Sequence, residues 1–273
     1  MSLREMAPGD MLFIDHVKEL RNRFLRIIVI TIAIMIACTV FGIHLVTVNN
    51  YSFYFLVPTV YNNIASQVTL FLSNSLIPKG VDLIQTAPGQ ALYAQIYVAI
   101  LISVSCSIPL IVREVFGFIS PAMSFTSRER AFFTFLLPTS VLFISGMVFS
   151  FYLAIPITLT FLYEYGQTIG VLTFLNISDF INFALQFFIA FGISFQLPLV
   201  MFMLTASGLV SLQFWIKNLK YALLIIILFG AIITPDGSGI TMWFISVPML
   251  LLYVIGIAII KIKESNKQDI HQT

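Results

Sequence analysis

The chain has 273 residues, of which 59% are hydrophobic and only 10% are charged. Because an ordinary soluble domain carries about 25% charged residues, a soluble fold of this composition would expose apolar patches far beyond what monomers tolerate. The net charge of +2 excludes a nucleic-acid-binding protein, whose binding face would be strongly basic. These values predict a single polytopic membrane domain over residues 1–273.

The long intervals without Asp, Glu, Lys or Arg predict six spans, since a spanning helix needs about 20 mostly apolar residues. Each is expected to be a helix, because hydrocarbon offers no partner for backbone polar groups. The fifth span has about 14 residues, or ~21 Å of helix, which is short for a hydrocarbon core of ~30 Å. Prolines in or beside the spans predict a bent bundle. The spans lie near 27–46, 92–112, 131–154, 180–206, 221–234 and 242–260, and these prolines are Pro138, Pro156, Pro198 and Pro248.

Residues 53–78 follow the first span within the same charge-free interval. Their apolar residues recur at helical spacing on one face, and polar residues occupy the other, which is typical of an amphipathic helix at an interface. We therefore predict an external amphipathic helix here and not a seventh span. The apolar face comprises Val57, Val60, Tyr61, Ile64, Val68, Phe71 and Leu72, and the polar face Thr59, Asn62, Asn63, Ser66, Gln67, Ser73 and Asn74.

The basic residues predict the orientation, because Lys and Arg favour the cytoplasmic side of short loops. They cluster before the first span, after the last span and in two loops between spans. With six spans, every basic residue except Lys79 is cytoplasmic. We expect a multi-pass protein of the cell membrane with both termini in the cytoplasm.

Motifs for enzymatic chemistry are missing. The three histidines are far apart and lack ligand spacing, and no H-E-x-x-H, G-x-S-x-G or P-loop string occurs. We therefore predict no enzyme activity, no metal site and no cofactor.

Two groups of ionisable residues lie close to membrane entry points. In residues 13–26, His16, Glu19 and Arg23 share one helical face, since steps of three and four residues stack. Glu129 stands between Arg128 and Arg130 at the start of the third span. Solvated anchoring explains both groups, but Glu19 and Glu129 on one side of the membrane also suit a cationic partner.

Six strings resemble the TatC family, the polytopic subunit of the twin-arginine protein translocase. They fall in family order across nearly the whole chain, and the six-span topology also matches. A single string would be weak, whereas the ordered set is specific. The strings are H-V-K-E-L-R at 16–21, F-L-V-P at 55–58, T-A-P-G-Q-A at 86–91, P-L-I-V-R-E-V-F-G-F-I-S-P-A at 109–122, F-G-I-S-F-Q-L-P at 191–198 and I-T-P-D at 233–236.

The resemblance implies recognition of signal peptides with two consecutive arginines and export of the attached proteins in folded form. A carboxylate accepts a guanidinium in a bidentate fork that lysine reproduces poorly, so two carboxylates can prefer Arg-Arg over Lys-Lys. The implied signal-peptide residues are Glu19, Glu129, Arg21, Phe118 and Pro121, with His16 beside them, and the implied loop residues are Pro58 and Asp236. Arg21 either holds Glu19 in place or simply anchors the chain.

The resemblance also implies partners and an energy source. The partners are single-span subunits of the TatA and TatB type, signal peptides, membrane lipid and further copies of the chain, and the energy comes from the proton gradient. Gln196 stands where many members carry a glutamate, so a proton relay there is not expected. We expect Gln196 to pair with a partner helix or within its own bundle, which cross-linking from Gln196→Cys distinguishes.

Three other functions remain open from the sequence. A proton- or ion-coupled transporter of a small solute would need strongly polar residues near the midplane, and Gln196 is the best candidate. The others are an intramembrane enzyme and a structural assembly factor.

Overall fold

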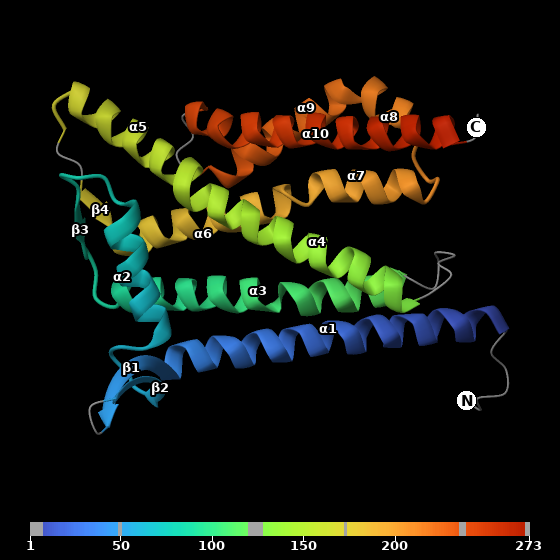
Figure 1. The fold of residues 1–273 in the computed structure, drawn as a ribbon. Helices are drawn as coiled ribbons and strands as arrows, with labels where there is room; N and C mark the ends of the chain where they lie inside the picture. Colours follow the sequence, from blue (N-terminus) through green and yellow to red (C-terminus); the bar gives the residue numbers. More distant parts are fainter. Residues whose placement is uncertain (1–7, 49–50, 120–127, 172–173, 235–238, 271–273) are drawn as a thin grey trace.

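The computed structural model describes residues 8–48, 51–119, 128–171, 174–234 and 239–270 (Figure 1). Within these ranges, five helical segments are long and apolar enough to cross a membrane: 17–40, 90–114, 136–168, 177–206 and 240–264. A sixth apolar helix, α9 (Leu219–Ile233), is shorter. The fold is therefore an all-α membrane protein with five helical segments long enough to cross a membrane.

The long helical segments run in alternating directions along the bundle (Figure 1). α1 (Pro8–Val40) packs against α3 (Gln90–Ile119), and α3 packs against α6 (Ile177–Ser194). α4 (Arg128–Phe149) also packs on α6 and continues through a π-helical turn (Ser150–Ala154) into α5 (Ile155–Thr168). α7 (Leu197–Ala206), α8 (Leu212–Lys217) and α9 pack against α10 (Ile240–Ile270).

The two ends of the bundle differ. In Figure 1, α1 begins and α10 ends on the same side of the bundle. The opposite end, which we call the cap end, carries β1 (Phe41–Val48), β2 (Tyr51–Pro58), α2 (Ile64–Leu76), β3 (Asp82–Ile84) and β4 (Phe174–Asn176). β1 pairs antiparallel with β2, and β3 pairs parallel with β4.

α6 forms the centre of the core because α3 and α4 both cover it. Its phenylalanines Phe180, Phe187 and Phe191 are buried, and the ring centroid of Phe191 lies 5.2 Å from that of Phe149. Large apolar side chains on the outer helices are instead exposed, as at Val29 on α1. Apolar side chains thus cover the outside of the bundle as well as its core, which suits a protein whose outer surface contacts lipid.

Two glycines allow α4 and α6 to approach closely. A Cβ atom at Gly146 would lie 2.4 Å from the backbone oxygen of Phe191, and one at Gly192 would lie 2.5 Å from the ring of Phe143. Small residues at crossings are a common device in membrane helix packing, which depends on close contact. The pair therefore sets the distance between the two helices.

Gly146→Ala is expected to destabilise the fold by about 1–3 kcal/mol. The obstacle is the backbone of α6, which cannot rotate away as a side chain could. Thermal unfolding in detergent measures the effect, and Ser145→Ala on the adjacent position is the control. Equal melting temperatures for Gly146→Ala and the control would contradict a close helix crossing.

The helical hydrogen-bond pattern changes before two of the four prolines expected to bend the helices. The π-helical turn ends just before Pro156, and a break at Phe195–Gln196 separates α6 from α7 just before Pro198. Proline lacks the backbone N–H and clashes with the preceding turn, so the helix loosens there. Pro138 and Pro248 instead lie inside continuous helices.

The boundaries of the first and third spans were wrong. The first helix ends at Val40 and not at 46, because residues 41–48 form β1 and pair with β2. Both segments are rich in aromatic and β-branched residues, which favour strands. The third helical segment does not end at 154 but runs on through α5 to Thr168.

The external helix predicted over 53–78 is present only over Ile64–Leu76. Residues 51–58 form β2 instead, and the side chain of Asn63 caps α2 by accepting a hydrogen bond from the backbone N–H of Ser66 (2.8 Å). The predicted faces are also partly wrong, since Tyr61 is exposed and Ser66 is buried. Ser66 tolerates burial because its hydroxyl donates to the carbonyl of Asn63 (2.8 Å).

Gln90 joins the elements of the cap end. Its Oε1 accepts hydrogen bonds from the backbone N–H of Thr86 (2.8 Å) and from Nδ2 of Asn176 (2.9 Å). Oδ1 of Asn176 in turn caps α6 by accepting from the backbone N–H of Ser178 (2.9 Å). The beginnings of α3 and α6 are thus held together by neutral amides.

Candidate functional site

A cluster of four charged side chains connects α1 with α3 at the end of the bundle opposite the cap end. Oε1 of Glu19 accepts hydrogen bonds from Nη2 (2.7 Å) and Nε (3.1 Å) of Arg23. Nη1 of Arg23 donates to Oε2 of Glu114 (3.1 Å), and Nη1 of Arg26 donates to Oε1 of Glu114 (2.7 Å). We call these residues, Glu19, Arg23, Arg26 and Glu114, the charged cluster.

Burial differs sharply across the charged cluster. The side chain of Glu114 is 2% exposed, whereas those of Arg23, Glu19 and Arg26 are 24%, 41% and 57% exposed. A buried carboxylate is tolerated only when it is paired and hydrogen-bonded, and two guanidiniums provide this for Glu114. Two negative and two positive charges balance, so the charged cluster has no net charge.

The charged cluster fixes the position of Glu19 through Arg23. Nη1 of Arg23 bonds Glu114 on α3, while its Nε and Nη2 hold Glu19 one helical turn earlier on α1. A planar guanidinium bonded at three nitrogens has little rotational freedom. Glu19 is therefore a carboxylate of fixed orientation that remains accessible from outside the chain.

The sequence analysis missed Glu114. It placed Glu114 within a family-like string but assigned it no role, because a carboxylate beside Arg113 at the end of an apolar run resembles an ordinary boundary residue. The signal that could have found it is the antiparallel pairing of the first two spans. That pairing brings the end of α3 level with Arg23 and Arg26 at the start of the apolar part of α1.

Among the predicted site residues whose side chains the structure describes, Glu19 lies in the charged cluster and Pro58 does not. Pro58 ends β2 at the cap end, far from Glu19. Arg21 is exposed, and Glu19 pairs with the guanidinium of Arg23.

The structure does not describe the side chains of five other predicted site residues. His16, Phe118 and Glu129 belong to α1, α3 and α4, but their side chains lie outside the described part, and Pro121 and Asp236 are not among the described residues.

Gln196 lies at the break between α6 and α7. Its Nε2 donates hydrogen bonds to the carbonyl oxygens of Thr139 (3.1 Å) and Gly192 (3.3 Å), which belong to α4 and α6. Its Oε1 is buried and has no hydrogen-bond partner among the described residues. The amide is thus bound within its own bundle through nitrogen, and a contact with a partner helix remains a prediction.

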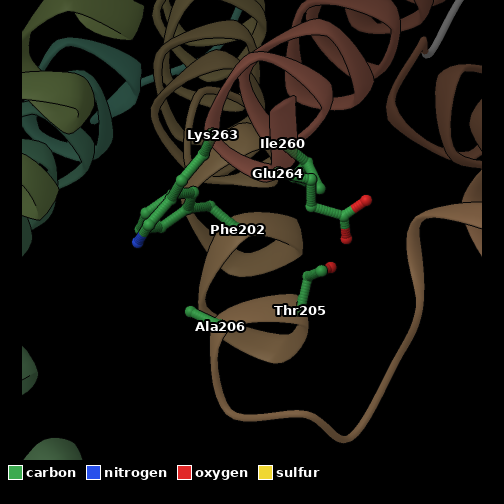
Figure 2. Close-up of a pocket in the computed structure, with 6 residues that line it drawn as sticks. All are labelled: Phe202, Thr205, Ala206, Ile260, Lys263 and Glu264. Atoms are coloured by element: carbon green, nitrogen blue, oxygen red, sulfur yellow. The ribbon is translucent and has the colours of Figure 1, made fainter. Parts of the chain in front are cut away.

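A separate pocket of about 290 Å³ lies between α7 and α10 (Figure 2). The amine of Lys263 lies 4.1 Å from the ring centroid of Phe202, and the hydroxyl of Thr205 accepts a hydrogen bond from Nε1 of Trp215 (2.9 Å). In Figure 2, the carboxylate of Glu264 points toward Thr205. α10 and α1 lie at opposite edges of the bundle in Figure 1, so this pocket is distinct from the charged cluster.

No group of three or more His, Cys, Asp or Glu side chains within the described ranges could hold a metal ion. Fold and site together define a multi-pass membrane protein that presents a partly exposed carboxylate, held by arginine, at one end of its helix bundle.

Comparison with known proteins identifies the family. The family model for TatC, the Sec-independent protein translocase protein, matches residues 15–248. The chain is 46% identical to the TatC protein of Cenarchaeum symbiosum (strain A), over 96% of this chain and 98% of that protein. It is 31% identical to the TatC protein of Carboxydothermus hydrogenoformans, over 94% and 95% of the two chains.

A solved TatC structure has a similar fold. The crystal structure of a twin-arginine translocase receptor, TatC, superposes with a TM-score of 0.74 and 27% identity, over 90% of this chain and 98% of that chain. The chain belongs to the TatC family of Sec-independent protein translocase proteins. It is thus a membrane protein of twin-arginine translocation and a transport protein, not an enzyme.

Proposed function

We propose that this chain is the receptor of its twin-arginine translocase, and that Glu19 binds an arginine of the signal peptide. The observation that carries the proposal is the charged cluster, in which Glu114 and Arg23 fix Glu19 while leaving its side chain 41% exposed. A pre-positioned carboxylate accepts a guanidinium without first losing conformational freedom. Glu129, which lies in the first turn of α4 at the same end of the bundle, is the proposed acceptor for the second arginine.

We further propose six spans with both termini in the cytoplasm. α1 begins and α10 ends at one end of the bundle, which requires an even number of crossings. α9 supplies the sixth: it is only ~22 Å long at 1.5 Å per residue, but apolar side chains such as Leu224 and Ile232 are exposed along it. Arg23, Arg26 and Lys263 at the shared end support its cytoplasmic placement, because basic residues favour that side.

The proposed partners are TatA- and TatB-type single-span subunits, folded proteins with Arg-Arg signal peptides, and further copies of this chain. Six spans are too few to enclose a folded protein, so other subunits must supply the rest of the passage. In the absence of any nucleotide-binding motif, the proton gradient is the proposed source of energy.

Export of a reporter fused to an Arg-Arg signal tests the receptor proposal. The chain is expressed with its single-span partners in cells that lack their own TatC-type protein. We expect a Lys-Lys version of the signal to reduce export by about tenfold or more, because an ammonium cannot form the planar two-bond contact of a guanidinium. Equal export of both reporters would overturn the proposal.

A further inference from the structure

We propose that the β1–β2 hairpin lies in the membrane boundary at the cap end, where it replaces the last turns of the first spanning helix and packs its apolar side chains against lipid. The observations that support this are the length of α1 relative to α3, the direct continuation of α1 into the hairpin, and the exposed apolar surface of the hairpin.

α1 does not extend as far toward the cap end as its neighbour α3. The hydroxyl of Thr31 donates to that of Ser107 (3.0 Å), which places these two residues at the same depth. From Thr31, α1 continues for about nine residues, or ~13 Å at 1.5 Å per residue. From Ser107, α3 continues toward the cap end for about 17 residues, or ~25 Å. Measured toward the cap end, the C-terminus of α1 therefore stops ~12 Å short of the N-terminus of α3.

A gap of this size spans the outer part of the membrane. The headgroup regions add about 10–15 Å to a hydrocarbon core of ~30 Å, or roughly 6 Å on each side. If Gln90 at the start of α3 reaches the water boundary, Val40 lies within the outermost part of the hydrocarbon. β1 begins at Phe41, directly after α1, so the hairpin starts at this depth.

The part of the hairpin next to α1 offers lipid an apolar face. Ile43 pairs with Leu56 and Leu45 pairs with Tyr54, so these four side chains share one face of the two strands. Their exposed fractions are 46%, 63%, 54% and 74%. On the other face, Phe55 is 60% exposed. Residues 41–58 contain no Asp, Glu, Lys or Arg, whereas a hairpin in water would alternate apolar and polar side chains.

Contacts of the hairpin with α2 and with Asn62 just before it fix its place, and the contact with α2 covers part of one strand edge. Nε2 of Gln67 donates to the carbonyl of Ile43 (3.0 Å), and a Cβ atom at Gly42 would lie 2.1 Å from the backbone oxygen of Asn62. Open strand edges are excluded from the hydrocarbon centre. The hairpin therefore belongs in the boundary layer, where headgroups and water reach its outer edge and where aromatic rings are favoured.

Fluorescence quenching in phosphatidylcholine vesicles tests the proposal. In the full chain with Cys38→Ala and Cys106→Ala, a fluorophore is attached at Tyr54→Cys or Leu56→Cys, both exposed positions. We expect nitroxide lipids labelled near the headgroup to quench both sites at least about twofold more than lipids labelled at the chain end. Val29→Cys on α1 is the control for the membrane interior, and Asp82→Cys on β3 is the control for water at the cap end.

Two results would overturn the lipid contact. Quenching by iodide as strong as at Asp82→Cys would place the hairpin in water. Protection from both iodide and nitroxide lipids would mean that a protein, such as a second copy of the chain, covers it. Because Asp82 lies on the same end of the fold, the comparison is independent of which end faces the cytoplasm.

Discussion

Replacing Arg23 and Arg26 together by methionine is expected to lower the free energy of unfolding by about 3–5 kcal/mol, because Glu114 would remain buried without a countercharge. Methionine keeps much of the length and the apolar stem of arginine, so lost packing contributes little. The effect should be asymmetric. Glu114→Met leaves two arginines that are 24% and 57% exposed and can turn their heads toward water, so its loss should be smaller.

Unfolding by SDS in mixed micelles, followed by circular dichroism, measures these differences. The matched control is Arg21→Met with Arg113→Met, which removes the same charge from two exposed positions and is expected to change stability by less than about 0.5 kcal/mol. The triple replacement of Arg23, Arg26 and Glu114 by methionine should recover most of the stability. A triple variant as unstable as the double variant would refute the role of the unpaired carboxylate.

The sequence was sufficient to predict the membrane class, the approximate positions of the long apolar helices and the family. These follow from charge-free apolar intervals and ordered strings, which depend little on tertiary contacts. The π-helical turn before Pro156 and the break before Pro198 lie at two of the four prolines expected to bend the helices, because proline acts on its own helix. Local chemistry was therefore a good guide wherever one segment determines its own structure.

Features that depend on contact between distant segments were missed. The β1–β2 hairpin looked like the end of a span followed by an amphipathic helix, because apolar composition alone does not separate helix from strand. The role of Glu114 was invisible because its partners lie on another helix, 88 and 91 positions away along the chain. Only the packing of α1 on α3 reveals that this carboxylate is buried and shared.

Glu19→Gln is expected to weaken binding of an Arg-Arg signal peptide by about tenfold to a hundredfold, since a hydrogen bond to a charged group contributes roughly 1.5–3 kcal/mol. The amide keeps the shape of the side chain but carries no negative charge, and one of its two polar atoms is a donor and not an acceptor. Stability should change by less than about 1 kcal/mol, because the Glu19–Arg23 pair is partly exposed and Arg23 keeps its contact with Glu114.

Binding of a fluorescent signal peptide to the purified chain in detergent measures the affinity. Glu264→Gln removes a carboxylate from the same end of the bundle, on the opposite edge, and should leave binding unchanged. A Lys-Lys peptide should bind the unaltered chain weakly and lose less on Glu19→Gln, because its ammonium makes no bidentate contact that the substitution could remove. Unchanged Arg-Arg binding by Glu19→Gln would remove Glu19 from the receptor site and leave Glu129 as the acceptor to test.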